Sequence, residues 1–167
     1  MVKVMLFAAA ASLFLSSRAL AQTSPALSTP AFIKAAAQTD AFERDEGRLA
    51  AARGSTGSVR DFGKMMVTDH TKTTEALKAA LRTAKLPSPP PPTLSTEQRH
   101  NLATLRSLHG AAFDKAYIEE QITTHQAALG VMQGYAAGGQ NAVLRKAAGD
   151  TVPIVERHLK LAQQIAG

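Results

Sequence analysis

The sequence has no cysteine and no tryptophan, and aromatic residues make up only 5% of its 167 residues. Without cysteine the chain can form no disulfide, no thiolate metal site and no cysteine nucleophile, and it has no cysteine to carry a lipid at a leader's cleavage site. The scarcity of aromatic side chains means that alanine, leucine, isoleucine, valine and methionine must fill the core.

No apolar run is long enough to cross a bilayer. The run over residues 5–15 falls short of the roughly 18 residues that a span needs, and no later run exceeds it. Lys3 precedes this run, and Ala19-Leu20-Ala21 supplies a small-x-small cleavage signal. We therefore predict a signal peptide over residues 1–21, cleaved before Gln22, and a mature chain that is exported to the periplasm or secreted.

The positive charge of the chain is not concentrated in any segment. Lys3 and Arg18 belong to the leader, which leaves 17 basic against 13 acidic residues in the mature chain. The basic residues alternate with acidic ones, and no basic cluster is interleaved with aromatics. The sequence therefore gives no indication of a nucleic-acid partner.

Capping patterns and glycines divide the mature chain into helices, and no segment has sustained strand alternation. After a disordered tail at 22–29, Thr29 as N-cap and Pro30 predict a helix over 30–53, ended by Gly54. A capping box at Ser58 and Asp61 predicts a second helix, over 58–86. The remaining predicted helices cover residues 96–108, 111–137 and 141–165; the first of them follows a capping box at Ser95 and Gln98, and the last is kinked or split by Pro153.

These lengths predict an all-α domain over residues 30–167. Four long helices with two short connections and one long connection are typical of an antiparallel, ferritin-like four-helix bundle. The long crossover joins the second and third long helices. It contains the proline-rich stretch 87–92, which cannot be helical, and the short helix.

Each predicted long helix places a polar side chain on its apolar stripe: Glu43, His70, His125 and His158. Gln121 lies one turn before His125 on the same face, and Asp114 three turns before it. Counted from the connecting turn, His158 is about six residues lower than His125, or roughly 9 Å at the helical rise. The sequence therefore predicts a level layer of Glu43, His70 and His125. Whether His158 reaches this layer stays open, because a kink at Pro153 would change its height.

Two interpretations of this inward layer remain open. Imidazoles with one carboxylate suit a single transition metal (zinc, iron, manganese or copper), with Asp114 as a further candidate ligand. The same groups also suit a hydrogen-bonded polar layer that sets the helix register without any metal. Tyr117 and Gln121 fit such a layer as hydrogen-bonding partners. Asp69 points about 100° away from His70 and suits its edge.

Four segments carry a resemblance to a known family: Glu43-x3-Gly47-Arg48-Leu49-Ala50, Phe62 to Met66 leading into Asp69-His70-Thr71, Phe113-Asp114-Lys115-Ala116-Tyr117 followed by His125, and Pro153 to Glu156 followed by His158-Leu159. In this order they resemble the bacterial domain-of-unknown-function family numbered 4142. The resemblance implies an exported ferritin-like bundle with no settled activity. It also implies characteristic polar residues at Glu43, Asp69, His70, Asp114, Tyr117, His125 and His158.

The chain departs from the pattern of di-iron bundles, which carry Glu-x-x-His on two helices. Val67 and Ile122 occupy the positions three residues before His70 and His125. The sequence therefore predicts one metal ion or none. It favours a non-enzymatic binding or structural protein of the cell envelope, acting through an envelope partner or a small ligand. The alternative is a metal-binding protein for storage, buffering or redox protection. The oligomeric state stays open.

Overall fold

The computed structural model describes residues 26–89 and 91–167. The predicted signal peptide and residues 22–25 of the predicted tail lie outside the described residues. Within the described residues the chain forms five helices and no strand, which confirms the all-α prediction. The helices are α1 (Thr29–Arg53), α2 (Gly57–Thr83), α3 (Thr96–Ser107), α4 (Gly110–Gly138) and α5 (Ala142–Ala166).

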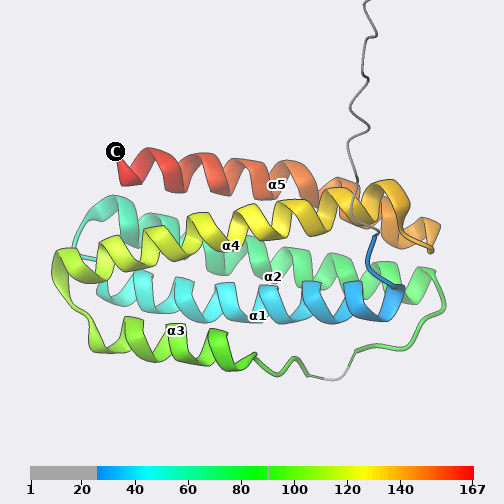
Figure 1. Ribbon diagram of the computed structural model, residues 1–167, viewed down its shortest axis with the longest axis horizontal. Helices are drawn as coiled ribbons and strands as arrows, with labels where there is room; N and C mark the ends of the chain where they lie inside the picture. Colours follow the sequence, from blue (N-terminus) through cyan, green and yellow to red (C-terminus); the bar gives the residue numbers. More distant parts are fainter. Residues whose placement is uncertain (1–25, 90) are drawn as a thin grey trace, which may run out of the picture.

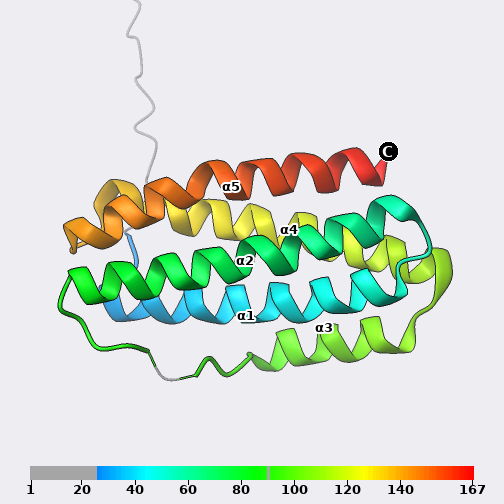
Figure 2. The same cartoon turned by 180° about the vertical axis from the view of Figure 1, so that it is seen from behind.

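The four long helices lie side by side, and neighbouring ones run antiparallel (Figures 1 and 2). α1 packs on α2 and α4 packs on α5, while α2–α5 and α1–α4 contacts join the two pairs. The short helix α3 lies against α1 and α4, at the end of a long connection that returns from α2. No helix among the described residues combines the length and apolar character that a bilayer crossing requires.

Local capping explains most helix ends, with two corrections to the predicted caps. Ser28, not Thr29, caps α1, accepting a hydrogen bond from the Ala31 amide at 3.4 Å. Thr56, not Ser58, caps α2, accepting from the Val59 amide at 3.3 Å. The reason for the second difference is a tertiary contact described below, which holds the chain at Ser55 and Thr56.

The two proline-related predictions had different outcomes. The capping box of Ser95 and Gln98 starts α3 as predicted, after the proline-rich connection. Pro153, however, lies inside an uninterrupted α5, so of the two predicted effects, a kink or a split near Asp150, the split is wrong. Proline removes one backbone hydrogen bond from a helix. Val155, His158 and Ala162 are buried along the following turns, and this packing holds the helix together across the defect.

The interior consists of two apolar clusters with a polar layer between them. One cluster contains Ala50, Val59, Phe62, Met66, Leu105, Phe113, Tyr117, Ile118 and Ala162. The other contains Phe32, Ala36, Leu77, Leu81, Tyr135, Leu144 and Ala148. Along each long helix, the buried polar residues of the layer fall in sequence between members of these two clusters: Asp40, Glu43, Glu46, His70, Gln121, His125 and His158.

A glycine pair sets the distance between α1 and α2 beside this layer. A Cβ atom added to Gly63 would lie 2.7 Å from the Gly47 carbonyl oxygen and 2.7 Å from the Ala51 amide nitrogen. One added to Gly47 would lie 2.8 Å from the Gly63 carbonyl oxygen. The obstructing atoms are backbone, so the two helices would have to move apart to admit a methyl group.

We expect Gly63→Ala to lower the free energy of unfolding by about 1–3 kcal/mol, the usual cost of overpacking. Gly130→Ala is the matched control, because a Cβ there meets nothing within 4 Å and alanine is the better helix former. Urea denaturation of both variants measures the difference. Equal stability of Gly63→Ala and the parent would show that the helices are not held at this distance.

Candidate metal centre

Three histidines from three helices meet at the middle of the polar layer. One ring nitrogen of each of His70 (α2), His125 (α4) and His158 (α5) lies within 4.8 Å of the other two. The residues are 5%, 2% and 0% exposed, so bulk water does not solvate the cluster. We call these three residues the histidine triad.

His158 belongs to the triad, a point that residue counting from the turn left open. Its Nδ1 lies 3.3 Å from His125 Nε2. α4 ends at Gly138, thirteen residues after His125, and α5 begins at Ala142, sixteen residues before His158. The offset is therefore about three residues, or roughly 4.5 Å along the axis, and two imidazole side chains can bridge it.

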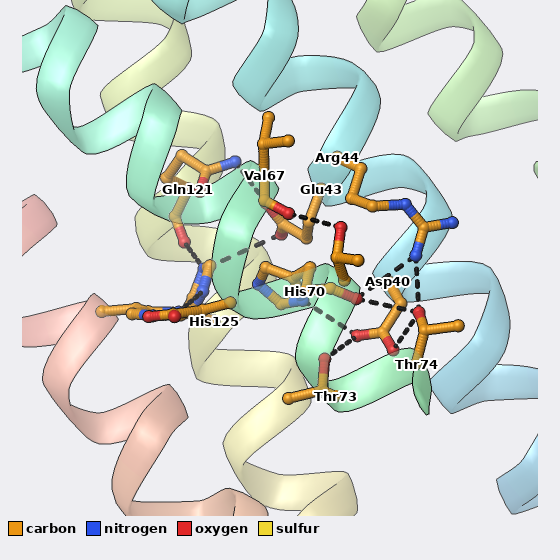
Figure 3. Close-up of polar contacts among 12 residues, drawn as sticks. Asp40, Glu43, Arg44, Val67, His70, Thr73, Thr74, Gln121 and His125 are labelled. Carbon is orange, nitrogen blue, oxygen red and sulfur yellow. Dashed lines mark hydrogen bonds and ion pairs between the residues drawn. The ribbon is translucent and has the colours of Figure 1, made fainter. Parts of the chain in front are cut away.

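The ring nitrogen of each histidine that faces away from the triad has its own acceptor. His70 Nδ1 lies 2.9 Å from Asp40 Oδ1, and His125 Nδ1 lies 2.8 Å from the backbone carbonyl oxygen of Gln121 (Figure 3). His158 Nε2 lies 3.2 Å from Asp69 Oδ2. A carbonyl or an ionised carboxylate only accepts, so these contacts place the ring protons on the outward nitrogens.

Burial keeps two of the three rings neutral. Burial, together with the neighbouring His70 and His158, lowers the pKa of His125 to about 3. Burial likewise lowers the pKa of His158 to about 4, although the hydrogen bond that His158 donates to Asp69 raises it. For His70, burial also lowers the pKa, but the hydrogen bond to Asp40 and the charge of Glu43 outweigh it, so that the net pKa is raised.

The inward nitrogens of His125 and His158 therefore carry lone pairs that face each other across 3.3 Å with no proton between them. The inward nitrogen of His70, Nε2, is buried without a hydrogen-bond partner. Two nitrogens on one tetrahedral zinc ion, each bound at about 2.0–2.1 Å, are about 3.3–3.4 Å apart. Neutral imidazoles whose outer N–H groups are held by carboxylates or carbonyls are the usual ligands of such ions, so the donor set fits a metal.

Glu43 lies beside the triad but outside it. Its Oε1 is 3.7 Å from His125 Nδ1, the nitrogen on the outward side of that ring. Its Oε2 accepts a hydrogen bond from Gln121 Nε2 at 2.5 Å. Burial raises the pKa of Glu43 to about 7, although His70 and the Gln121 hydrogen bond lower it.

Asp114, in the first turns of α4, lies away from the histidines and contacts the chain just before α2. Its carboxylate accepts from the Ser55 amide at 2.8 Å, the Ser55 hydroxyl at 2.6 Å and the Thr56 amide at 3.1 Å. Burial raises the pKa of Asp114, but these hydrogen bonds outweigh it and the net pKa is lowered. Tyr117, one turn further along α4, packs in the apolar cluster with Phe62 and Phe113, and its hydroxyl is buried.

Sequence reasoning missed two buried acids of α1, Asp40 and Glu46. Asp40 also accepts from the hydroxyls of Thr73 at 2.8 Å and Thr74 at 2.9 Å, which orients it toward His70. Glu46 Oε2 accepts from Gln121 Nε2 at 2.8 Å. The signal was the three-residue spacing of Asp40, Glu43 and Glu46, which puts all three carboxylates on one side of a helix.

Asp69 connects the triad to the surface. Besides His158, its carboxylate pairs with Arg157 at 2.6 Å and with Lys72 at 3.1 Å, and its side chain is 13% exposed. Burial raises the pKa of Asp69, but the hydrogen bonds with His158 and Lys72 lower it below its usual value. The carboxylate is therefore ionised at neutral pH and serves as the acceptor for His158.

Fold and site together define an all-helical protein with a buried triad of oriented imidazoles. The comparison with protein families agrees with the motifs: the chain belongs to the family described as Domain of unknown function (DUF4142), whose model matches residues 15–165. No curated protein and no solved structure matches the chain.

We expect Asp114→Ala to lower the free energy of unfolding at pH 7 by about 1–3 kcal/mol, because two backbone amides and a hydroxyl lose their acceptor. The folded-state pKa is lowered, so this stabilisation is present above the usual aspartate pKa and is lost as the pH falls through the folded-state value. Urea titrations of parent and variant from pH 7 downward should therefore converge in acid. Asp61→Ala, at an exposed aspartate paired only with Lys64, is the control and should stay close to the parent. A difference that is unchanged in acid would contradict this account.

Proposed function

We propose that this protein is an exported, ferritin-like four-helix-bundle protein that binds one transition-metal ion through His70, His125 and His158. Export rests on the leader pattern of residues 1–21. The ferritin-like assignment is supported by two pairs of long helices joined by one long crossover that carries α3. Family membership is compatible with this role and does not specify an activity.

The observation that carries the proposal is the 3.3 Å contact between His125 Nε2 and His158 Nδ1, two nitrogens whose rings hold their protons on the opposite side. In the absence of a cation, two acceptors at 3.3 Å inside a protein repel each other, and low polarity strengthens that repulsion. A bound cation turns the contact into two favourable bonds. The unpartnered Nε2 of His70 supplies the third ligand.

The donor set indicates the kind of metal. Three imidazoles, each binding through an unprotonated ring nitrogen, suit zinc or copper better than manganese or magnesium, which prefer oxygen ligands. A three-histidine site leaves a fourth position for water or another group. Because the triad residues are at most 5% exposed, a substrate has no open approach to that position, which favours storage or buffering over turnover.

Untagged protein purified from the exported fraction should carry about one equivalent of zinc or copper by elemental mass spectrometry. The double variant His70→Ala/His125→Ala should carry none while staying folded by circular dichroism. His100→Ala, which removes an exposed histidine on α3, is the matched control and should keep the metal. Zinc at about one hundred times its dissociation constant should stabilise the metal-free parent by about 2.7 kcal/mol.

The competing account is a structural polar layer that acts through envelope partners or a small ligand. It predicts no metal in either protein, and a parent that melts at the same temperature with and without zinc, iron, manganese or copper. That result would overturn the proposed function.

A further inference from the structure

A second group of buried polar atoms lies next to the triad and is not used by it. Glu43 and Glu46 on α1 and Tyr117 and Gln121 on α4 are all 0% exposed. Four of their oxygens are buried without a hydrogen-bond partner: Glu43 Oε1, Glu46 Oε1, Gln121 Oε1 and the Tyr117 hydroxyl. Buried polar atoms without a partner lower stability, so four of them on two facing helices require an explanation.

Helical spacing brings these groups together. Glu43 and Glu46 are three residues apart, and Tyr117 and Gln121 are four apart, so each pair shares one helix face. The two faces meet at the Gln121 amide, whose nitrogen lies 2.5 Å from Glu43 Oε2 and 2.8 Å from Glu46 Oε2. One amide nitrogen thus serves two carboxyl groups.

The two carboxyl groups have no lysine or arginine partner among the described residues, and His70 lowers the pKa of Glu43 without outweighing burial. Arg44, their neighbour on α1, donates instead to the His70 carbonyl and the Thr74 hydroxyl. Burial raises the pKa of Glu46 well above its usual value, and the charge of Glu43 raises it further. Two adjacent buried acids lacking a cation are thus unfavourable in their ionised form.

We propose that Glu43 and Glu46, together with the Gln121 amide oxygen and the Tyr117 hydroxyl, bind a hard divalent cation of the manganese class. The Gln121 amide nitrogen now donates to both carboxylates. Rotating the amide by 180° exchanges its nitrogen and oxygen, so that the Oε1 atom faces the carboxylates and becomes a ligand for the cation. Two carboxylates neutralise the charge of the ion, and the phenol and amide oxygens are neutral.

This site differs from the triad in donor chemistry. It offers oxygen donors only, which suit Mg²⁺, Ca²⁺ or Mn²⁺ rather than copper. It goes beyond the proposed function and does not depend on a loaded triad. Glu43 connects the two, because its Oε1 lies 3.7 Å from His125 Nδ1.

The experiment measures Mn²⁺ binding to the full mature chain by the loss of the free-ion electron paramagnetic resonance signal. We expect the triad variant His158→Gln to bind one equivalent of Mn²⁺ as the parent does. Glu46→Gln, which keeps shape but removes one charge, should bind Mn²⁺ at least tenfold more weakly. Glu75→Gln, at an exposed glutamate paired with Lys78, is the matched control and should bind like the parent.

Zinc titration of the same variants separates the two proposals. Loss of Mn²⁺ binding in Glu46→Gln with zinc binding intact supports both sites. Mn²⁺ binding that Glu46→Gln weakens, in a protein that never binds zinc, overturns the triad and supports the second site. No Mn²⁺ binding to the parent at millimolar concentration, or equal binding by folded Glu46→Gln, overturns the second site.

Discussion

The hydrogen bonds on the outward nitrogens of the histidines are the constraint on which the site depends. Asp40, Asp69 and the Gln121 carbonyl accept from His70, His158 and His125. Because these partners accept, they determine which nitrogen of each ring carries the proton and which nitrogen faces inward. They also fix the ring planes, as the supporting groups around metal-binding histidines usually do. The inward lone pairs, their 3.3 Å separation and the suitability for a cation all follow from these three contacts.

A polar layer of this kind requires a scaffold that holds its helices at fixed heights. Apolar clusters on both sides supply the burial, and both draw residues from all four long helices, one of them with Leu105 of α3 as well. The Gly47–Gly63 contact brings α1 close to α2, so that Asp40 reaches His70 across the interface. Asp114 holds the α1–α2 turn against α4 and thereby ties the two helix pairs together. Unsatisfied polar atoms lower stability, and here they are concentrated beside the candidate metal ligands.

Local signals predicted the helices, and tertiary contacts account for what was missed. The Ser95–Gln98 box and the glycines act within a few residues, so they are readable from sequence. The cap of α2 is Thr56 and not the predicted Ser58, because Asp114, 58 residues away, holds the chain at that turn. His158 lies close to His125 because their relative height depends on the residues at which α4 ends and α5 begins, and not only on the number of residues between them. The triad was visible only as separate inward histidines, and Glu46 was overlooked although its spacing from Glu43 marks the same face.

The account is tested most directly by the protonation of the ring nitrogens, which long-range ¹H–¹⁵N correlation spectra of the metal-free protein report. Our account predicts His125 protonated on Nδ1 and His158 on Nε2, both neutral at pH 7, with the inward nitrogens unprotonated. Adding zinc should shift the resonances of those inward nitrogens and leave the outward N–H groups unchanged. A doubly protonated His125 or His158, or the opposite tautomers, would place a proton between the rings. The cluster would then be a hydrogen-bonded layer rather than a metal centre.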